Sequence, residues 1–166
     1  MRILATLALL VALSGCATYE PPVPVGYTGP TASIGEHGIS EDSSKAKLFY
    51  VEAIDGKPVR SSLIATRRAT AGRGFSLAMD YVVHTVPARP LRLKLVGTHV
   101  TGAPIHEIAS RAAGTFFSVE GELTFTPEPD GEYFITGKLQ KEGSAVWVAD
   151  ARTEKPVSTV ISVPRQ

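Results

Sequence analysis

The sequence predicts an all-β protein in which two antiparallel sheets pack as a sandwich. From Lys47 onward the chain consists of short apolar runs rich in Val, Ile, Phe, Tyr and Thr, separated by Gly, Pro and Asp clusters. These runs recur about every ten residues, a spacing typical of antiparallel strands and their turns rather than of alternating strands and helices. We therefore expect one β-sandwich domain over residues 31–166, in which Thr31–Ile34 forms a short edge strand.

A signal peptide and a tether are expected before this domain. Arg2 is followed by the apolar run Ile3–Leu13 and the small residues Ser14 and Gly15, the order found in secretory signal peptides. At ~1.5 Å per residue this run spans only about half of a ~30 Å hydrocarbon core, so we do not expect a permanent transmembrane helix. Prolines and glycines then alternate over 17–30, which is typical of an extended, semi-rigid chain. The predicted organisation is a removed signal peptide (1–15), a tether beginning at Cys16 (16–30) and one domain (31–166).

Turn signals divide the domain into strands. Asp55-Gly56 is a strong hairpin signal, and Pro87–Pro90 forms a second turn. Along 91–95 the leucines alternate with Arg92 and Lys94, so one face is apolar and the other charged. The expected strands are 47–54, 59–67, 74–86, 91–100, 117–126, 133–139, 144–150 and 157–163.

The strands 117–126 and 133–139 have the clearest alternation and are expected to form a hairpin. The intervening "PEPDG" turns the chain, and the pairing that aligns the apolar faces sets Phe125 opposite Tyr133. Gly121 then lies opposite Gly137. The two glycines would leave a gap on the inner face that a bulky side chain from the facing sheet could fill.

One segment, 103–113, does not have the period of a strand. Its apolar residues have helical spacing, Pro104 suits a first helical turn, and Gly114 is suited to end a helix. A short helix and an irregular crossover are both open. Either would connect the two sheets.

Leu13-Ser14-Gly15-Cys16 resembles the lipobox of bacterial lipoproteins. The resemblance implies that a diacylglycerol joins the sulfur of Cys16, that cleavage occurs just before this residue, and that its new amino group is acylated. Two or more acyl chains hold a protein stably at a membrane, whereas one chain holds it only marginally. Ala17 follows the cysteine where an aspartate would favour retention at the inner membrane, so the resemblance implies the outer membrane. The alternative is an ordinary secreted protein.

Two turns share a local form, "IDGKPVRSS" and "ADARTEKPVST", each leading from a strand through an Asp-containing turn to Lys-Pro-Val. They resemble the turns of exported immunoglobulin-like and transthyretin-like sandwiches. The wider sequence is similar to small uncharacterised bacterial lipoproteins of the outer membrane. This resemblance implies the fold and carries over no catalytic residue.

The charge balance argues against a nucleic-acid partner. The chain has 17 Lys and Arg against 16 Asp and Glu, and removal of Arg2 leaves the mature chain formally neutral. Cys16 is the only cysteine, so no disulfide is expected within the chain. Apart from the covalent lipid on Cys16, no cofactor is expected.

The four histidines do not predict a catalytic or metal site. They lack a tight metal-ligand spacing, and no serine lies in a Gly-x-Ser-x-Gly turn. Asp80 and His84 would lie about 13 Å apart along a straight strand, too far for a hydrogen bond. We therefore expect no metal ion and no catalytic residues, with an enzyme assembled from distant residues as the alternative. The histidines are His37, His84, His99 and His106.

The most distinctive polar feature is "ATRRATAGRG". Arg67, Arg68 and Arg73 crowd a glycine-containing loop between strands, which could bind phosphates of lipopolysaccharide or acidic groups of a partner. The alternative is a solvated hairpin tip. Trp147, among valines, is expected to close the sandwich core, with an exposed binding platform as the alternative.

Together these features predict a lipid-anchored, non-enzymatic binding or structural module on the periplasmic face of the bacterial outer membrane. The expected partner is an envelope protein, peptidoglycan or lipopolysaccharide. An inhibitor of a lysozyme or protease, with a protruding loop over 67–74, is one alternative. A small hydrolase or ligand-binding protein is the other.

Overall fold

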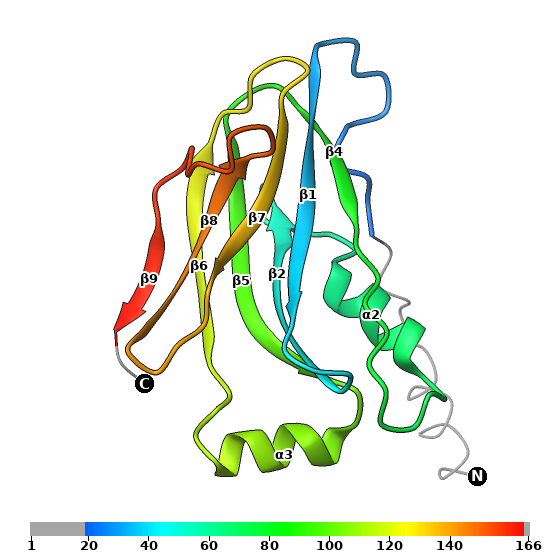
Figure 1. Ribbon diagram of the computed structural model, residues 1–166. Coiled ribbons are helices and arrows are strands. Elements are labelled where there is room, and N and C mark those ends of the chain that lie inside the picture. Colours follow the sequence, from blue (N-terminus) through cyan, green and yellow to red (C-terminus); the bar gives the residue numbers. More distant parts are fainter. Residues whose placement is uncertain (1–18, 165–166) are drawn as a thin grey trace, which may run out of the picture.

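A computed structural model describes residues 19–164 and confirms a mostly β protein (Figure 1). The described part contains nine strands and two short helices. The strands are β1 (Thr31–Ser40), β2 (Lys45–Ile54), β3 (Lys57–Pro58), β4 (Val83–Pro87), β5 (Leu91–Thr101), β6 (Ser118–Phe125), β7 (Glu132–Lys138), β8 (Gly143–Asp150) and β9 (Ile161–Pro164). The helices are α2 (Ser62–Thr70) and α3 (Pro104–Ala112). The predicted signal peptide, the lipobox and Cys16 lie outside the described residues.

The strands form one continuous sheet, so the two-sheet sandwich is not confirmed. Their order is β6-β5-β2-β1-β7-β8-β9, with β3 beside β2 and β4 beside β1. The first half of β1 pairs with β4 and β7, and its second half pairs with β2, so β1 joins both parts of the sheet. The sheet curls until its two end strands approach each other: a Cβ at Gly121 of β6 would lie 2.8 Å from the Ile161 side chain of β9. The result is nearly barrel-shaped (Figure 1).

Strand β1 is longer and more central than the predicted edge strand over Thr31–Ile34. Ala32 and Ile34 are buried, and each side of the strand has hydrogen-bonded neighbours. Its pairing with β7 is parallel, whereas the other strand pairs are antiparallel. The expectation of a purely antiparallel sheet is therefore wrong at this pair.

The core fills the inside of the curled sheet, and Phe49 lies at its centre. This ring is fully buried and occupies the space over two glycines, Gly97 and Gly137. The predicted hairpin register is wrong, because β6 pairs with β5 while β7 pairs with β1 and β8. The expected gap between Gly121 and Gly137 does not form, because the two glycines are not paired: Phe49 fills the space over Gly137, and Ile161 fills the space over Gly121. The rings of Phe125 and Tyr133 also touch edge to face, with centroids 5.0 Å apart.

Helix α2 replaces the strand predicted over 59–67. Its inner face carries hydroxyl groups at every fourth position, and each hydroxyl accepts a hydrogen bond from the backbone of the segment 78–82. The N–H groups of Val82, Asp80 and Ala78 lie 2.8, 3.0 and 3.1 Å from the hydroxyl oxygens of Ser62, Thr66 and Thr70. Four helical residues rise by ~6.0 Å and two extended residues by ~6.6 Å, so the two spacings match. We call this arrangement the hydroxyl ladder.

The hydroxyl ladder also explains why the predicted strand 74–86 is short. The N–H groups of Ala78, Asp80 and Val82 donate to the helix instead of to a neighbouring strand, and β4 begins only at Val83. The hairpin turn predicted at Asp55-Gly56 is present between β2 and β3. Both residues have the positive φ that such a turn requires.

Segment 103–113 is helical in the structure, as one of the two alternatives predicted. Helix α3 connects β5 to β6, which are neighbours in the sheet, so it does not cross between sheets. It lies across the lower end of these strands (Figure 1). Within residues 19–164, no helix has the length and apolar character needed to span a membrane.

The part of the predicted tether that the structure describes, 19–30, contains neither helix nor strand. It lies against the turn between β2 and β3, where Glu20 forms an ion pair with Lys57.

Candidate functional site

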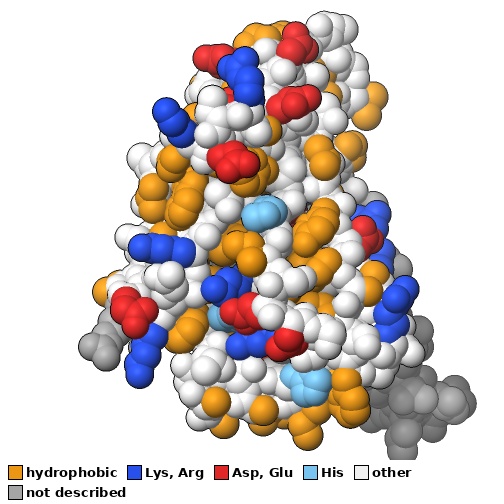
Figure 2. Space-filling view, viewed as in Figure 1, with side chains coloured by type: hydrophobic (Ala, Val, Ile, Leu, Met, Phe, Trp, Pro, Cys, Tyr) orange, Lys and Arg blue, Asp and Glu red, His pale blue; other side chains and the backbone are white. Residues whose placement is uncertain are grey.

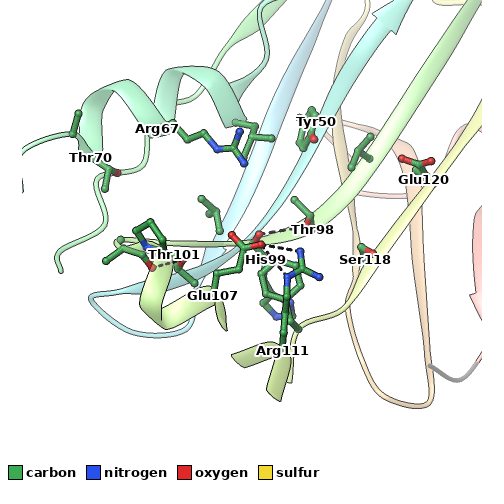
Figure 3. A pocket seen from close by; sticks show the side chains of 18 of the residues that line it. Tyr50, Arg67, Thr70, Thr98, His99, Thr101, Glu107, Arg111, Ser118 and Glu120 are labelled. Carbon is green, nitrogen blue, oxygen red and sulfur yellow. Dashed lines mark hydrogen bonds and ion pairs between the residues drawn. The ribbon is translucent and has the colours of Figure 1, made fainter. Parts of the chain in front are cut away.

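A cavity of about 670 Å³ lies between α2, α3 and the outer face of β2, β5 and β6 (Figure 3). It opens on the side of the sheet opposite the main core. Helices α2 and α3 both contribute residues to the walls of this cavity. The side chains used below are Tyr50, Leu63, Arg67, Val96, Arg111 and Glu120.

The floor of the cavity is apolar. Tyr50, Val96 and Val100 belong to a second cluster of buried side chains, against which Leu63 of α2 packs. Burial raises the pKa of Tyr50 to about 12, so its phenol is neutral at physiological pH. The floor therefore offers apolar surface and one neutral hydroxyl group.

Helix α3 turns its polar side toward the cavity. Pro104, Glu107 and Arg111 line the cavity, whereas Ile105 and Ile108 on the other side are 62% and 67% exposed. The Arg111 guanidinium donates to the Glu107 carboxylate at 2.8 Å and stacks over the Phe116 ring at 3.9 Å. Arg111 is thus held in place by contacts within the protein.

Arg67 is the one member of the predicted arginine cluster that lines the cavity. Arg67 and Arg68 lie on α2 rather than in a loop, and Arg73 follows in the turn after the helix. The prediction of a loop is therefore wrong for Arg67 and Arg68, which are helical. Arg67 points toward the floor beside Tyr50 (Figure 3).

Glu120 of β6 lies on the other side of Tyr50 from Arg67 (Figure 3). Both charged groups act on the Tyr50 phenol, since Arg67 lowers its pKa and Glu120 raises it. Over the wider face shown in Figure 2, acidic and basic side chains are interspersed, as the nearly neutral composition leads one to expect.

Two of the histidines contact carboxylates, His84 in the buried core and His99 at the border of the cavity. His84 Nε2 lies 2.8 Å from Glu36 Oε1, and both side chains are buried. Asp80 does not pair with His84; its backbone bonds to Thr66 instead. His99 borders the cavity, but its Nδ1 accepts the N–H of Phe117 and its Nε2 lies 3.4 Å from Glu41. Burial lowers the pKa of His99, which favours the neutral ring.

Glu36 is a buried carboxylate that the sequence analysis missed. It accepts hydrogen bonds from the backbone N–H groups of Val51 and Ser62 as well as bonding to His84, and so joins β1, β2, β4 and the start of α2. A signal was present: Ala32, Ile34 and Glu36 share one face of β1, so an acid continues a buried apolar row.

Trp147 does not close the core. It lies half-buried on the outer face of β8, and its indole N–H is buried without a partner in the described part of the chain. Within residues 19–164, no group of three or more His, Cys, Asp or Glu side chains is arranged to hold a metal ion.

Comparison with known proteins adds no relative. No family model matches the chain, and no curated protein and no solved structure matches it. The cavity between α2 and α3 is therefore the candidate site on its geometry alone.

Proposed function

We propose that this protein is a lipid-anchored binding module on the periplasmic face of the outer membrane, and that the cavity between α2 and α3 is its binding site. The cavity carries the proposal. Its volume of about 670 Å³ falls within the range of roughly 300–1,000 Å³ found for small-molecule sites. An apolar floor with a few charged groups at the rim is also typical of such sites.

The anchor rests on the lipobox resemblance of Leu13-Ser14-Gly15-Cys16. Acyl chains on Cys16 would fix the protein to the membrane, and the tether would present the domain to envelope components. An inhibitor with a protruding loop over 67–74 has less support, because residues 67–70 belong to α2 and are packed by the hydroxyl ladder. A hydrolase has less support because Nε2 of His84 and both ring nitrogens of His99 contact protein groups.

Membrane fractionation of cells tests the anchor. We expect Cys16→Ser to abolish acylation, so that the signal peptide is no longer cleaved before residue 16. The mass of the acyl chains should then be missing from the protein. Ser14→Ala, which retains a small residue before the cysteine, is the matched control and should still be acylated. If Cys16→Ser is processed normally and differs in mass from the wild type only by the exchange of sulfur for oxygen, the anchor is refuted.

Photocrosslinking in intact cells tests the cavity. A diazirine-bearing amino acid replaces Thr98, which lines the cavity, or Thr124, which is exposed on the same face but outside it. We expect a discrete mass adduct on the intact protein at position 98 and none at position 124. Equal labelling at both positions, or none at either, would refute the proposed binding site.

A further inference from the structure

We infer that the cavity takes a zwitterionic ligand, whose anionic group binds Arg67 and whose ammonium group binds Glu120, with an apolar part over the floor between them. This inference deepens the proposed function and rests on it. It follows from two opposite charges that face one cavity and form no ion pair within residues 19–164.

Arg67 is a cation available to a ligand. Other cavity cations are used within the protein: Arg111 bonds to Glu107 and stacks on Phe116. Arg67 forms no ion pair with any residue in 19–164, although its guanidinium lies beside the buried Tyr50. A planar guanidinium with free donors binds a carboxylate or phosphate with two parallel hydrogen bonds.

Glu120 is the matching anion: within residues 19–164 it forms no ion pair, although Lys94, which pairs with Glu52, also acts on it electrostatically. On the outer face of β5 and β6, Lys94 is opposite Glu122, and Val96 is opposite Glu120. The other carboxylates of this face have cations, since Glu122 pairs with Arg92 and Glu52 with Lys94. Val96 interrupts the charged row of β5 where the apolar floor begins, so within the described chain Glu120 forms no ion pair.

The two charges therefore require a ligand that carries both signs. An anion alone would approach Glu120 unfavourably, and a cation alone would approach Arg67 unfavourably, because like charges repel. A zwitterion satisfies both, and its apolar middle covers Tyr50, Val96 and Leu63. Free peptides and ethanolamine phospholipid headgroups both have this chemistry.

Calorimetric titration of the full-length protein in detergent tests the inference and distinguishes these sources. The probes are the tripeptide Ala-Leu-Ala, its N-acetylated form and its C-amidated form, and separately glycerophosphoethanolamine with glycerophosphoglycerol as its counterpart lacking an ammonium group. We expect removal of either charge to weaken binding roughly threefold to tenfold, the range for charge-assisted contacts near a surface. Tighter binding of the tripeptide identifies a peptide as the ligand, and tighter binding of glycerophosphoethanolamine identifies a phospholipid headgroup.

Matched variants assign each charge to its residue. Glu120→Gln should abolish the effect of acetylation and leave the effect of amidation, while Arg67→Gln should do the reverse. The matched controls are Glu122→Gln, two residues along β6 from Glu120, and Arg68→Gln, next to Arg67 on α2. Neither residue lines the cavity, so both variants should preserve both capping effects. Capping effects that persist in Glu120→Gln and Arg67→Gln would overturn the inference. So would a lack of binding by all probes while the crosslink at position 98 persists, a result that would leave the proposed binding site intact.

Discussion

Removal of the Glu36 carboxylate should destabilise the fold more than any surface change. The carboxylate accepts the N–H of Val51 at 3.1 Å and that of Ser62, and it lies 2.8 Å from Nε2 of His84. Glu36→Ala would leave both backbone donors buried without an acceptor, at a cost of about 1–3 kcal/mol each. It would also remove the hydrogen-bond partner of the His84 imidazole. Two buried donors left without an acceptor together predict a loss of about 2–6 kcal/mol.

Urea unfolding followed by circular dichroism measures this loss as a lower midpoint at an unchanged slope. Glu36→Gln keeps the size of the side chain and one acceptor oxygen but presents an NH2 group to a donor, so its loss should be smaller, about 1–3 kcal/mol. Glu120→Gln, an exposed carboxylate on β6, should change stability by less than about 0.5 kcal/mol. If Glu36→Ala unfolds within about 1 kcal/mol of the wild type, the carboxylate does not hold these elements together and the reasoning fails.

Three further predictions concern the ladder, the core and pH. Thr66→Val removes the hydroxyl that accepts the Asp80 N–H and should lower the free energy of unfolding by about 1–3 kcal/mol in urea titrations; an unchanged value would show that the bond is replaced by water. Gly97→Ala would bring a Cβ to 2.9 Å from the Phe49 ring and should lower the free energy of unfolding by about 1–3 kcal/mol. When Phe49→Leu is added in the same chain, the combined loss should be smaller than the sum of the two single losses. Strict additivity would contradict the contact. Because burial lowers the pKa of His99, the unfolded chain takes up this proton at a higher pH than the folded chain does. The free energy of unfolding should therefore fall as the pH drops through about 6.5, and it should level off below the lowered pKa of the folded state. His99→Gln should flatten that fall in urea titrations from pH 7.5 to 5, and an equally steep fall would contradict the assignment.

Strands with a regular alternation could be predicted from the sequence because one buried face suffices to define them. β5 and β6 show this pattern, with Leu93 and Leu123 buried and Arg92 and Glu122 exposed. Local turn chemistry was equally informative at Asp55-Gly56, where the required backbone conformation depends only on neighbouring residues.

The missed features depend on contacts distant in sequence. The apolar and hydroxyl residues of 59–67 suit a strand locally, and they become helical because Ser62 and Thr66 find partners near residue 80. Likewise, the hairpin expected at Phe125 and Tyr133 failed because β7 pairs with β1, about a hundred residues earlier. Arg67 was predicted as a binding residue from local crowding, but its opposing Glu120 comes from a strand that only the tertiary fold brings near.

The hydroxyl ladder gives α2 a protective role at the flank of the sheet. The amide hydrogens of Ala78, Asp80 and Val82 point at side-chain oxygens, so they cannot recruit a strand from another molecule. Partial melting of this single helix would uncover them together, next to β4. The first step toward self-association of this protein should therefore be the loss of nine helical residues rather than the opening of the sheet.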